Sequence, residues 1–153
     1  MVQHLLLLCC IVLNPQAILV VDDDESLVSL MGELLQREGY QVWTARDGLQ
    51  GYSSYYQHQA ETIVTDINMP ELDGFEMMRY IRAIDPRARA IYMSGAPEQY
   101  RRTLVSEAQN FGATVLRKPF KEIELLKLIQ AFAGQNTKLE FPNHKGLVWK
   151  EAV

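Results

Sequence analysis

The chain has 153 residues, with 15 Lys and Arg and 19 Asp and Glu, which give a net charge of −4. This length suits one domain, and 48% apolar with 22% charged residues excludes a disordered, collagen-like or coiled-coil chain. The net negative charge argues against a general nucleic-acid binder. The charge is uneven, because residues 1–80 hold 12 acidic and 3 basic residues, whereas residues 81–153 hold 7 and 12.

The chain begins with an apolar run over residues 5–13 that contains its only two cysteines, Cys9 and Cys10. Adjacent cysteines rarely form an unstrained disulfide, so the sequence favours a reducing compartment, and we expect a cytoplasmic protein. The run is shorter than the roughly 20 residues that span a bilayer, so no membrane span is expected. No Lys or Arg precedes it and no small-residue cleavage site follows, which favours an N-terminal extension over residues 1–16 and leaves a signal peptide as the alternative.

From residue 17 onward, short β-branched runs alternate with helical patterns. Strands are predicted at residues 17–21, 40–45, 62–65, 90–93 and 114–116. Helices are predicted at residues 26–38, 47–58, 74–84, 98–110 and 121–132. The run 17–21 is apolar throughout, which indicates a central parallel strand, whereas the alternation in 40–45 indicates a strand nearer an edge. Five strand–helix units predict an α/β domain over residues 17–133, a doubly wound five-stranded parallel sheet, followed by a C-terminal tail, 134–153.

Helical spacing predicts which side chains face the sheet. The helix 26–38 is expected to bury Leu27, Leu30, Met31, Leu34 and Leu35, and the helix 121–132 to align Ile123, Leu126, Ile129 and Ala133. Six arginines are expected on solvated helix faces rather than in a phosphate-binding patch: Arg79, Arg82, Arg87, Arg89, Arg101 and Arg102.

Polar residues stand where four of the predicted strands end. Asp22 and Asp23 follow the first strand, Asp66 the third, Ser94 the fourth and Lys118 the fifth. Ligands of open α/β sheets bind outside the carboxyl ends of the strands, so these side chains are expected to converge.

The chemistry of this group predicts phosphoryl transfer. Carboxylates about 4 Å apart repel by roughly 4 kcal/mol per pair at an effective dielectric constant of 20, so three of them favour a bound cation. Oxygen ligands without His or Cys select a hard ion such as Mg²⁺. A carboxylate beside Mg²⁺, a lysine and a hydroxyl suits in-line attack on phosphorus, with the carboxylate as nucleophile.

Four segments carry a family resemblance: ILVVDDDESL (18–27), IVTDINMPELDGFEMMRYIR (63–82), IYMSGAP (91–97) and VLRKPF (115–120). Together, in this order and spacing, they resemble the receiver domain of two-component response regulators over residues 17–133. The resemblance implies a (βα)5 fold with the flavodoxin-like strand order 2-1-3-4-5.

The resemblance also implies roles for individual residues. It places the phosphoaccepting aspartate at Asp66, the switch hydroxyl at Ser94 and the phosphate-binding lysine at Lys118, with a cis bond between Lys118 and Pro119. It implies that Mg²⁺ is held by Asp22, Asp23, Asp66 and the main-chain carbonyl of Asn68.

Two positions depart from the family pattern. Val115 stands where the family usually has an aromatic residue that reports phosphorylation, and Gly95 replaces a commoner alanine. The output switch is therefore expected to differ from the usual one, while the phosphoryl chemistry is unaffected.

The expected function is that of a stand-alone response regulator. A histidine kinase or histidine phosphotransfer protein would donate the phosphoryl group, and a protein effector would read the result, with no direct nucleic-acid contact. Because residues 134–153 are too few for a helix-turn-helix domain, no DNA-binding output is expected. No turnover of a separate substrate is expected.

Two alternatives stay open. Val115 is compatible with a receiver-like binding module that works without phosphorylation. A phosphohydrolase of the haloacid-dehalogenase type fits less well, because it needs a second aspartate where Asn68 stands and a nucleophile after the first strand.

Overall fold

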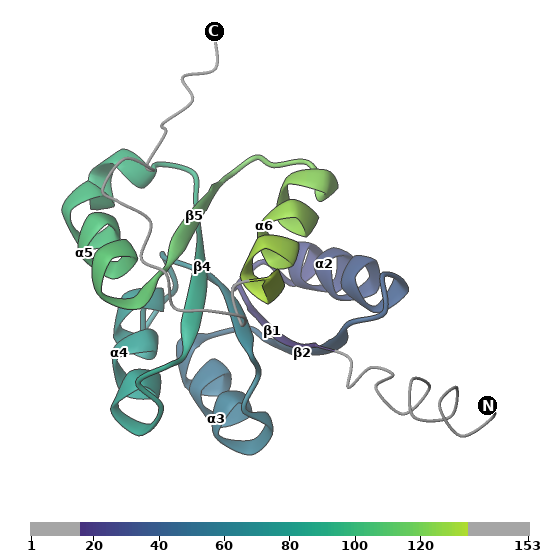
Figure 1. Cartoon of the computed structure of the whole chain (residues 1–153), viewed down its shortest axis with the longest axis horizontal. Coiled ribbons are helices and arrows are strands. Elements are labelled where there is room, and N and C mark those ends of the chain that lie inside the picture. The colour runs from purple at the N-terminus through teal and green to yellow at the C-terminus, as the bar shows by residue number, and fades with distance from the viewer. Residues whose placement is uncertain (1–15, 135–153) are drawn as a thin grey trace, which may run out of the picture.

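A computed structural model describes residues 16–134 as a five-stranded parallel sheet with helices on both faces (Figure 1). The strands are β1 (Ala17–Val21), β2 (Gln41–Ala45), β3 (Thr62–Asp66), β4 (Arg89–Ser94) and β5 (Thr114–Arg117). Their order is β2-β1-β3-β4-β5, and each neighbouring pair is parallel. The predicted fold class and strand order are therefore confirmed.

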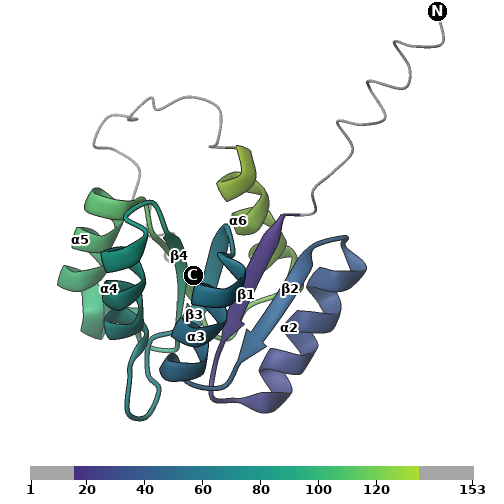
Figure 2. The same cartoon turned by 90° about the horizontal axis from the view of Figure 1, so that it is seen from below.

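The helices divide into two layers (Figures 1 and 2). They are α2 (Glu25–Arg37), α3 (Gly48–His58), α4 (Gly74–Ile84), α5 (Arg101–Phe111) and α6 (Glu122–Gly134), with a 3₁₀ helix, η1 (Pro97–Tyr100), before α5. Helices α2 and α6 cover one face, and α3, α4 and α5 cover the other. No helix within residues 16–134 is long and apolar enough to cross a bilayer. Except for residues 16 and 134, the predicted extension and tail lie outside the described residues, so the domain limits stay a prediction.

The central position of β1 follows from its apolar sequence. Ile18 and Val20 pack under α2 and α6, whereas Leu19 and Val21 pack under α3, α4 and α5. All four are fully buried. A strand that is apolar on both faces is stable only between two helical layers, and β1 lies between β2 and β3 as the pattern predicted. Strand β2 lies at an edge and is partly exposed along its length.

Several details of the helices differ from the prediction. Leu30 is 56% exposed and Ile123 is 53% exposed. Ala133 is exposed as well. The prediction is confirmed for Met31, Leu34, Leu35 and Ile129, and the two helices also bury three side chains that it did not name: Val28, Leu125 and Phe132. Spacing by three and four residues fits two neighbouring stripes of a helix, and only contact with the sheet selects one of them. The helix predicted from residue 98 begins as η1 at Pro97, and regular α-helix starts at Arg101.

Candidate functional site

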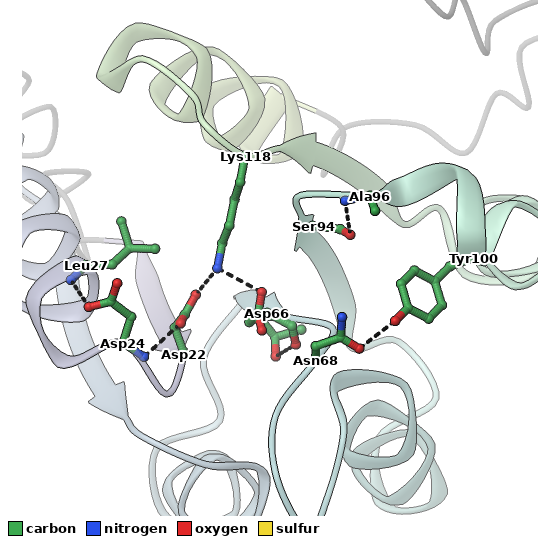
Figure 3. A network of polar contacts seen from close by, with 10 residues as sticks. Asp22, Asp24, Leu27, Asp66, Asn68, Ser94, Ala96, Tyr100 and Lys118 are labelled. Atoms are coloured by element: carbon green, nitrogen blue, oxygen red, sulfur yellow. Dashed lines mark hydrogen bonds and ion pairs between the residues drawn. The ribbon is translucent and has the colours of Figure 1, made fainter.

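The polar residues predicted to converge do lie together at one edge of the sheet. Asp22 follows β1, Asp66 ends β3, Ser94 ends β4 and Lys118 follows β5. Since the four strands are parallel neighbours, their carboxyl ends meet at the same edge. Figure 3 shows the side chains of Asp22, Asp66 and Lys118 pointing toward one another.

Lys118 joins the two buried carboxylates. Its Nζ lies 2.6 Å from Oδ2 of Asp22 and 2.8 Å from Oδ1 of Asp66. Asp22 is 1% exposed and Asp66 is 7% exposed. Charge-assisted hydrogen bonds are strong at such burial, so the ammonium group holds both side chains in place.

A third carboxylate leaves the site with excess negative charge. Asp23 is exposed, and one carboxylate oxygen each of Asp22, Asp23 and Asp66 lie within 4.8 Å of one another. One lysine cannot neutralise three carboxylates. A set of oxygen ligands with net negative charge fits a hard divalent cation that keeps several waters, so these residues fit the Mg²⁺ implied by the resemblance.

The environment shifts two ionisation equilibria in the site. Burial raises the pKa of the Asp66 carboxyl, and the neighbouring Asp22 and Asp23 raise it further, although the Lys118 hydrogen bond opposes both. Burial alone would lower the pKa of Lys118, but its hydrogen bonds to Asp22 and Asp66 outweigh burial and raise it. Burial thus dominates the shift at Asp66, and the two carboxylates dominate the shift at Lys118. A cation beside Asp66 would favour its ionised form.

The loop after Asp66 is shaped by Gly74 and Asp73. A Cβ atom at Gly74 would lie 2.2 Å from the main-chain oxygen of Asp66, so only glycine fits there. The Gly74 N–H donates to the Ile67 carbonyl (2.9 Å), and the Asp73 side chain accepts from Glu76 N (2.8 Å), which caps α4. This end of α4 is thereby fixed against the end of β3.

Ser94 is 3% exposed, and its hydroxyl oxygen accepts a hydrogen bond from the Ala96 N–H (3.1 Å). The Lys118 N–H donates to the Ser94 carbonyl (2.8 Å), which joins the ends of β4 and β5. The Lys118–Pro119 bond is cis, as predicted. The hydroxyl and the lysine therefore lie on directly connected strand ends.

Asn68 lies on the loop that follows Asp66, and its side chain is exposed. Its Oδ1 accepts a hydrogen bond of 2.5 Å from the Tyr100 hydroxyl. Sequence reasoning missed Tyr100, because nothing in the pattern links two residues 32 positions apart. Val115, which stands where the family usually has an aromatic residue, is half-buried. It pairs in register with Tyr92 of β4 and packs into the core under α3, α4 and α5.

Fold and site together define a receiver-type α/β domain, with an acidic cluster and a lysine at the carboxyl edge of a parallel sheet. The family model described as the response regulator receiver domain matches residues 18–130, and the chain belongs to this family. The chemotaxis protein CheY of Bacillus subtilis is 32% identical over 114 residues, which cover 73% of this chain and 92% of CheY. Sporulation initiation phosphotransferase F of the same organism is 29% identical over 118 residues, which cover 76% and 93%.

A solved structure of a receiver domain is similar to most of this chain. The receiver domain of the sensor histidine kinase PA1611 from Pseudomonas aeruginosa PAO1 matches with a TM-score of 0.68 and 30% identity. The match covers 78% of this chain and 98% of that domain, which was crystallised with a magnesium ion coordinated in its active-site cleft.

Proposed function

We propose that this domain accepts a phosphoryl group on Asp66 from a histidine kinase or a histidine phosphotransfer protein. In the transfer, a carboxylate oxygen of Asp66 forms a bond to phosphorus while the bond from phosphorus to the donor's histidine nitrogen breaks, and that nitrogen keeps the electron pair. The observation that carries the proposal is the Lys118 ammonium, 2.8 Å from the Asp66 carboxylate, where it can neutralise phosphoryl oxygens.

The residues that would hold Mg²⁺ are Asp22, Asp23, Asp66 and the main-chain carbonyl of Asn68. When bound, the ion supplies positive charge for the phosphoryl oxygens. The contribution of the chain is to keep the carboxylates ionised and oriented, which Lys118 does through its bonds to Asp22 and Asp66. The burial of Ser94 at the adjacent strand end suits a hydroxyl that turns from Ala96 toward a phosphoryl oxygen.

The proposed output is a change in protein–protein contacts. The phosphorylated domain would shift its conformational population, and a protein effector would bind one population better. A kinase that uses ATP would place the reaction in the cytoplasm. Each phosphoryl group would be accepted and released at Asp66 itself, with no separate substrate turned over.

The test uses the full chain with acetyl phosphate and Mg²⁺, followed by intact mass spectrometry. We expect an acid-labile gain of one phosphoryl group, and we expect Asp66→Asn to abolish it. Asp24→Asn is the matched control, because Asp24 caps α2 beside the site and Asn caps equally well. No labelling of the wild type, or equal labelling of Asp66→Asn, would disprove the proposal.

The second candidate, a binding module that works without phosphorylation, is favoured by the valine at position 115. Beryllofluoride mimics a phosphoryl group on aspartate, so amide NMR spectra with and without it separate the two functions. Shifts in α4, α5 and β5 would support the phosphorylation switch, and unchanged spectra would support the module.

A further inference from the structure

A tyrosine outside the predicted site reaches into it from η1. The Tyr100 hydroxyl donates to Oδ1 of Asn68 at 2.5 Å, and Asn68 lies two residues after Asp66 (Figure 3). This contact joins the loop after β3 to the segment after β4. The two segments therefore share a side-chain link beside the proposed phosphorylation site.

The Tyr100 ring is held independently of its hydroxyl. Tyr100 is half-buried, and its ring packs at a tilt of 57° against the Phe75 ring of α4, with centroids 5.8 Å apart. Phe75 in turn packs at a tilt of 48° against the buried ring of Tyr92, with centroids 4.7 Å apart. Because packing holds the ring, the hydroxyl is a fixed donor rather than the end of a mobile side chain.

A fixed donor selects one orientation of the Asn68 amide. A carboxamide has an acceptor oxygen and a donor NH₂ group on opposite branches, so binding its oxygen turns its nitrogen the other way. Figure 3 shows the oxygen facing Tyr100 and the nitrogen turned to the side on which Ser94 lies. Within residues 16–134, Nδ2 of Asn68 has no hydrogen-bond partner.

We infer that Tyr100 is a positioning residue that holds the Asn68 amide nitrogen toward a phosphoryl group on Asp66 and so slows its hydrolysis. The inference rests on the proposed function. In hydrolysis, water forms a bond to phosphorus, the bond from phosphorus to the Asp66 oxygen breaks, and inorganic phosphate leaves with the Asp66 carboxylate restored. Attack is easier when an acceptor oxygen takes a hydrogen bond from the water. With its oxygen held by Tyr100, Asn68 presents a donor to the phosphoryl oxygens and turns its acceptor away.

The experiment measures the lifetime of the phosphoryl group. Wild type, Tyr100→Phe, Asn68→Ala and the double variant are labelled with acetyl phosphate and Mg²⁺, desalted and followed by intact mass spectrometry. We expect Tyr100→Phe to lose the phosphoryl group at least about threefold faster than wild type, the size that one hydrogen bond allows. In the Asn68→Ala background, Tyr100→Phe should leave the rate of phosphoryl loss unchanged, because the side-chain amide through which Tyr100 acts is missing.

The control is Tyr56→Phe, which removes a hydroxyl from an exposed tyrosine of α3 and should decay like wild type. Thermal unfolding of each variant shows whether it is folded, and a purely structural role for Tyr100 would lower the melting temperature without this dependence on Asn68. The inference would be overturned if Tyr100→Phe lost the phosphoryl group as slowly as wild type. It would also be overturned if Tyr100→Phe accelerated the loss equally in the Asn68→Ala background. Absence of any label in wild type would instead overturn the proposed function.

Discussion

Both faces of the sheet have an apolar core, but only one of them also buries a charged side chain of a helix. On one face, every buried side chain of α2 and α6 is apolar. On the other face, α4 buries Arg82 beside the apolar side chains of Met77, Met78 and Ile81, and Leu104 is the one buried side chain of α5. An element with little buried apolar surface depends on directional polar contacts, and it can shift at lower cost than one packed into a dry core. We therefore expect α5 to shift more easily than α2 and α6.

The polar contacts of α5 centre on Glu107. Arg82 of α4 forms a buried ion pair with Glu107, and the Tyr92 hydroxyl of β4 donates to the same carboxylate at 2.5 Å. Arg82 also donates through Nε to the Ala88 carbonyl (3.3 Å) and lies 3.8 Å from the centroid of the Phe111 ring. The prediction of a solvated Arg82 was therefore wrong. Burial raises the pKa of the Tyr92 hydroxyl, and the Glu107 carboxylate raises it further. The hydroxyl therefore stays protonated and donates its hydrogen bond to Glu107.

The largest expected effect comes from Glu107→Ala. It leaves Arg82 buried without its partner and Tyr92 without its acceptor, so we expect a loss of about 4 kcal/mol of unfolding free energy. Urea denaturation measures this loss. Glu33→Ala, which removes an exposed carboxylate from α2, is the control and should stay within about 0.5 kcal/mol of wild type.

A triple variant tests whether the loss in Glu107→Ala comes from unpaired buried polar groups. Arg82→Met, Glu107→Leu and Tyr92→Phe together replace the ion pair and the hydroxyl by apolar groups, and only the Ala88 carbonyl loses a hydrogen-bond donor. We expect most of the stability lost in Glu107→Ala to return. A loss below about 1 kcal/mol in Glu107→Ala would mean that α5 is held by something other than this network, and the contrast between the two faces would fail.

The apolar face should respond to volume instead. Leu35 of α2 is fully buried, and Leu35→Ala should cost roughly 3 kcal/mol through lost burial and the cavity that remains. Leu35→Met nearly conserves volume and should cost less than about 1.5 kcal/mol. Urea denaturation of both variants tests this, and equal losses would show that shape rather than volume limits packing beneath α2.

The features that the sequence predicted correctly are those with a local signal. The fold and the strand-end residues followed from local signals, because a run such as 17–21 reveals burial by its own composition and each polar residue comes directly after a strand. Parallel pairing then brings Asp22, Asp66 and Lys118 together without any further information.

What the sequence could not predict depends on contacts between distant segments. The choice of buried stripe on α2, which exposes Leu30, is made by the sheet. The burial of Arg82 depends on Glu107, 25 residues away. The hydrogen bond from Tyr100 to Asn68 likewise has no local pattern. These contacts lie mainly on the α3, α4 and α5 face, where polar partners come from different elements.

The smallest expected effect concerns a second polar link on that face. The Tyr55 hydroxyl of α3 donates to Oδ2 of Asp85 at 2.8 Å, at the end of α4. This hydrogen bond lowers the pKa of the Asp85 carboxyl, and the hydrogen bond from the Arg87 N–H lowers it by a smaller amount. Tyr55→Phe should therefore cost about 1 kcal/mol near neutral pH, measured by urea denaturation.

The stability lost in Tyr55→Phe should depend on pH, in a direction set by the lowered pKa of the Asp85 carboxyl. A carboxyl whose pKa is lower in the folded than in the unfolded chain adds stability above the ordinary Asp value of about 3.9, and this stability is lost as pH falls through the folded-state pKa. The difference between wild type and Tyr55→Phe should thus narrow as the pH is lowered from 7 toward 3, whereas Tyr56→Phe should show no such trend. A difference that stays constant over this range would mean that the Tyr55 hydroxyl does not act through the ionised Asp85 carboxylate, and the proposed charge-assisted link between α3 and α4 would be wrong.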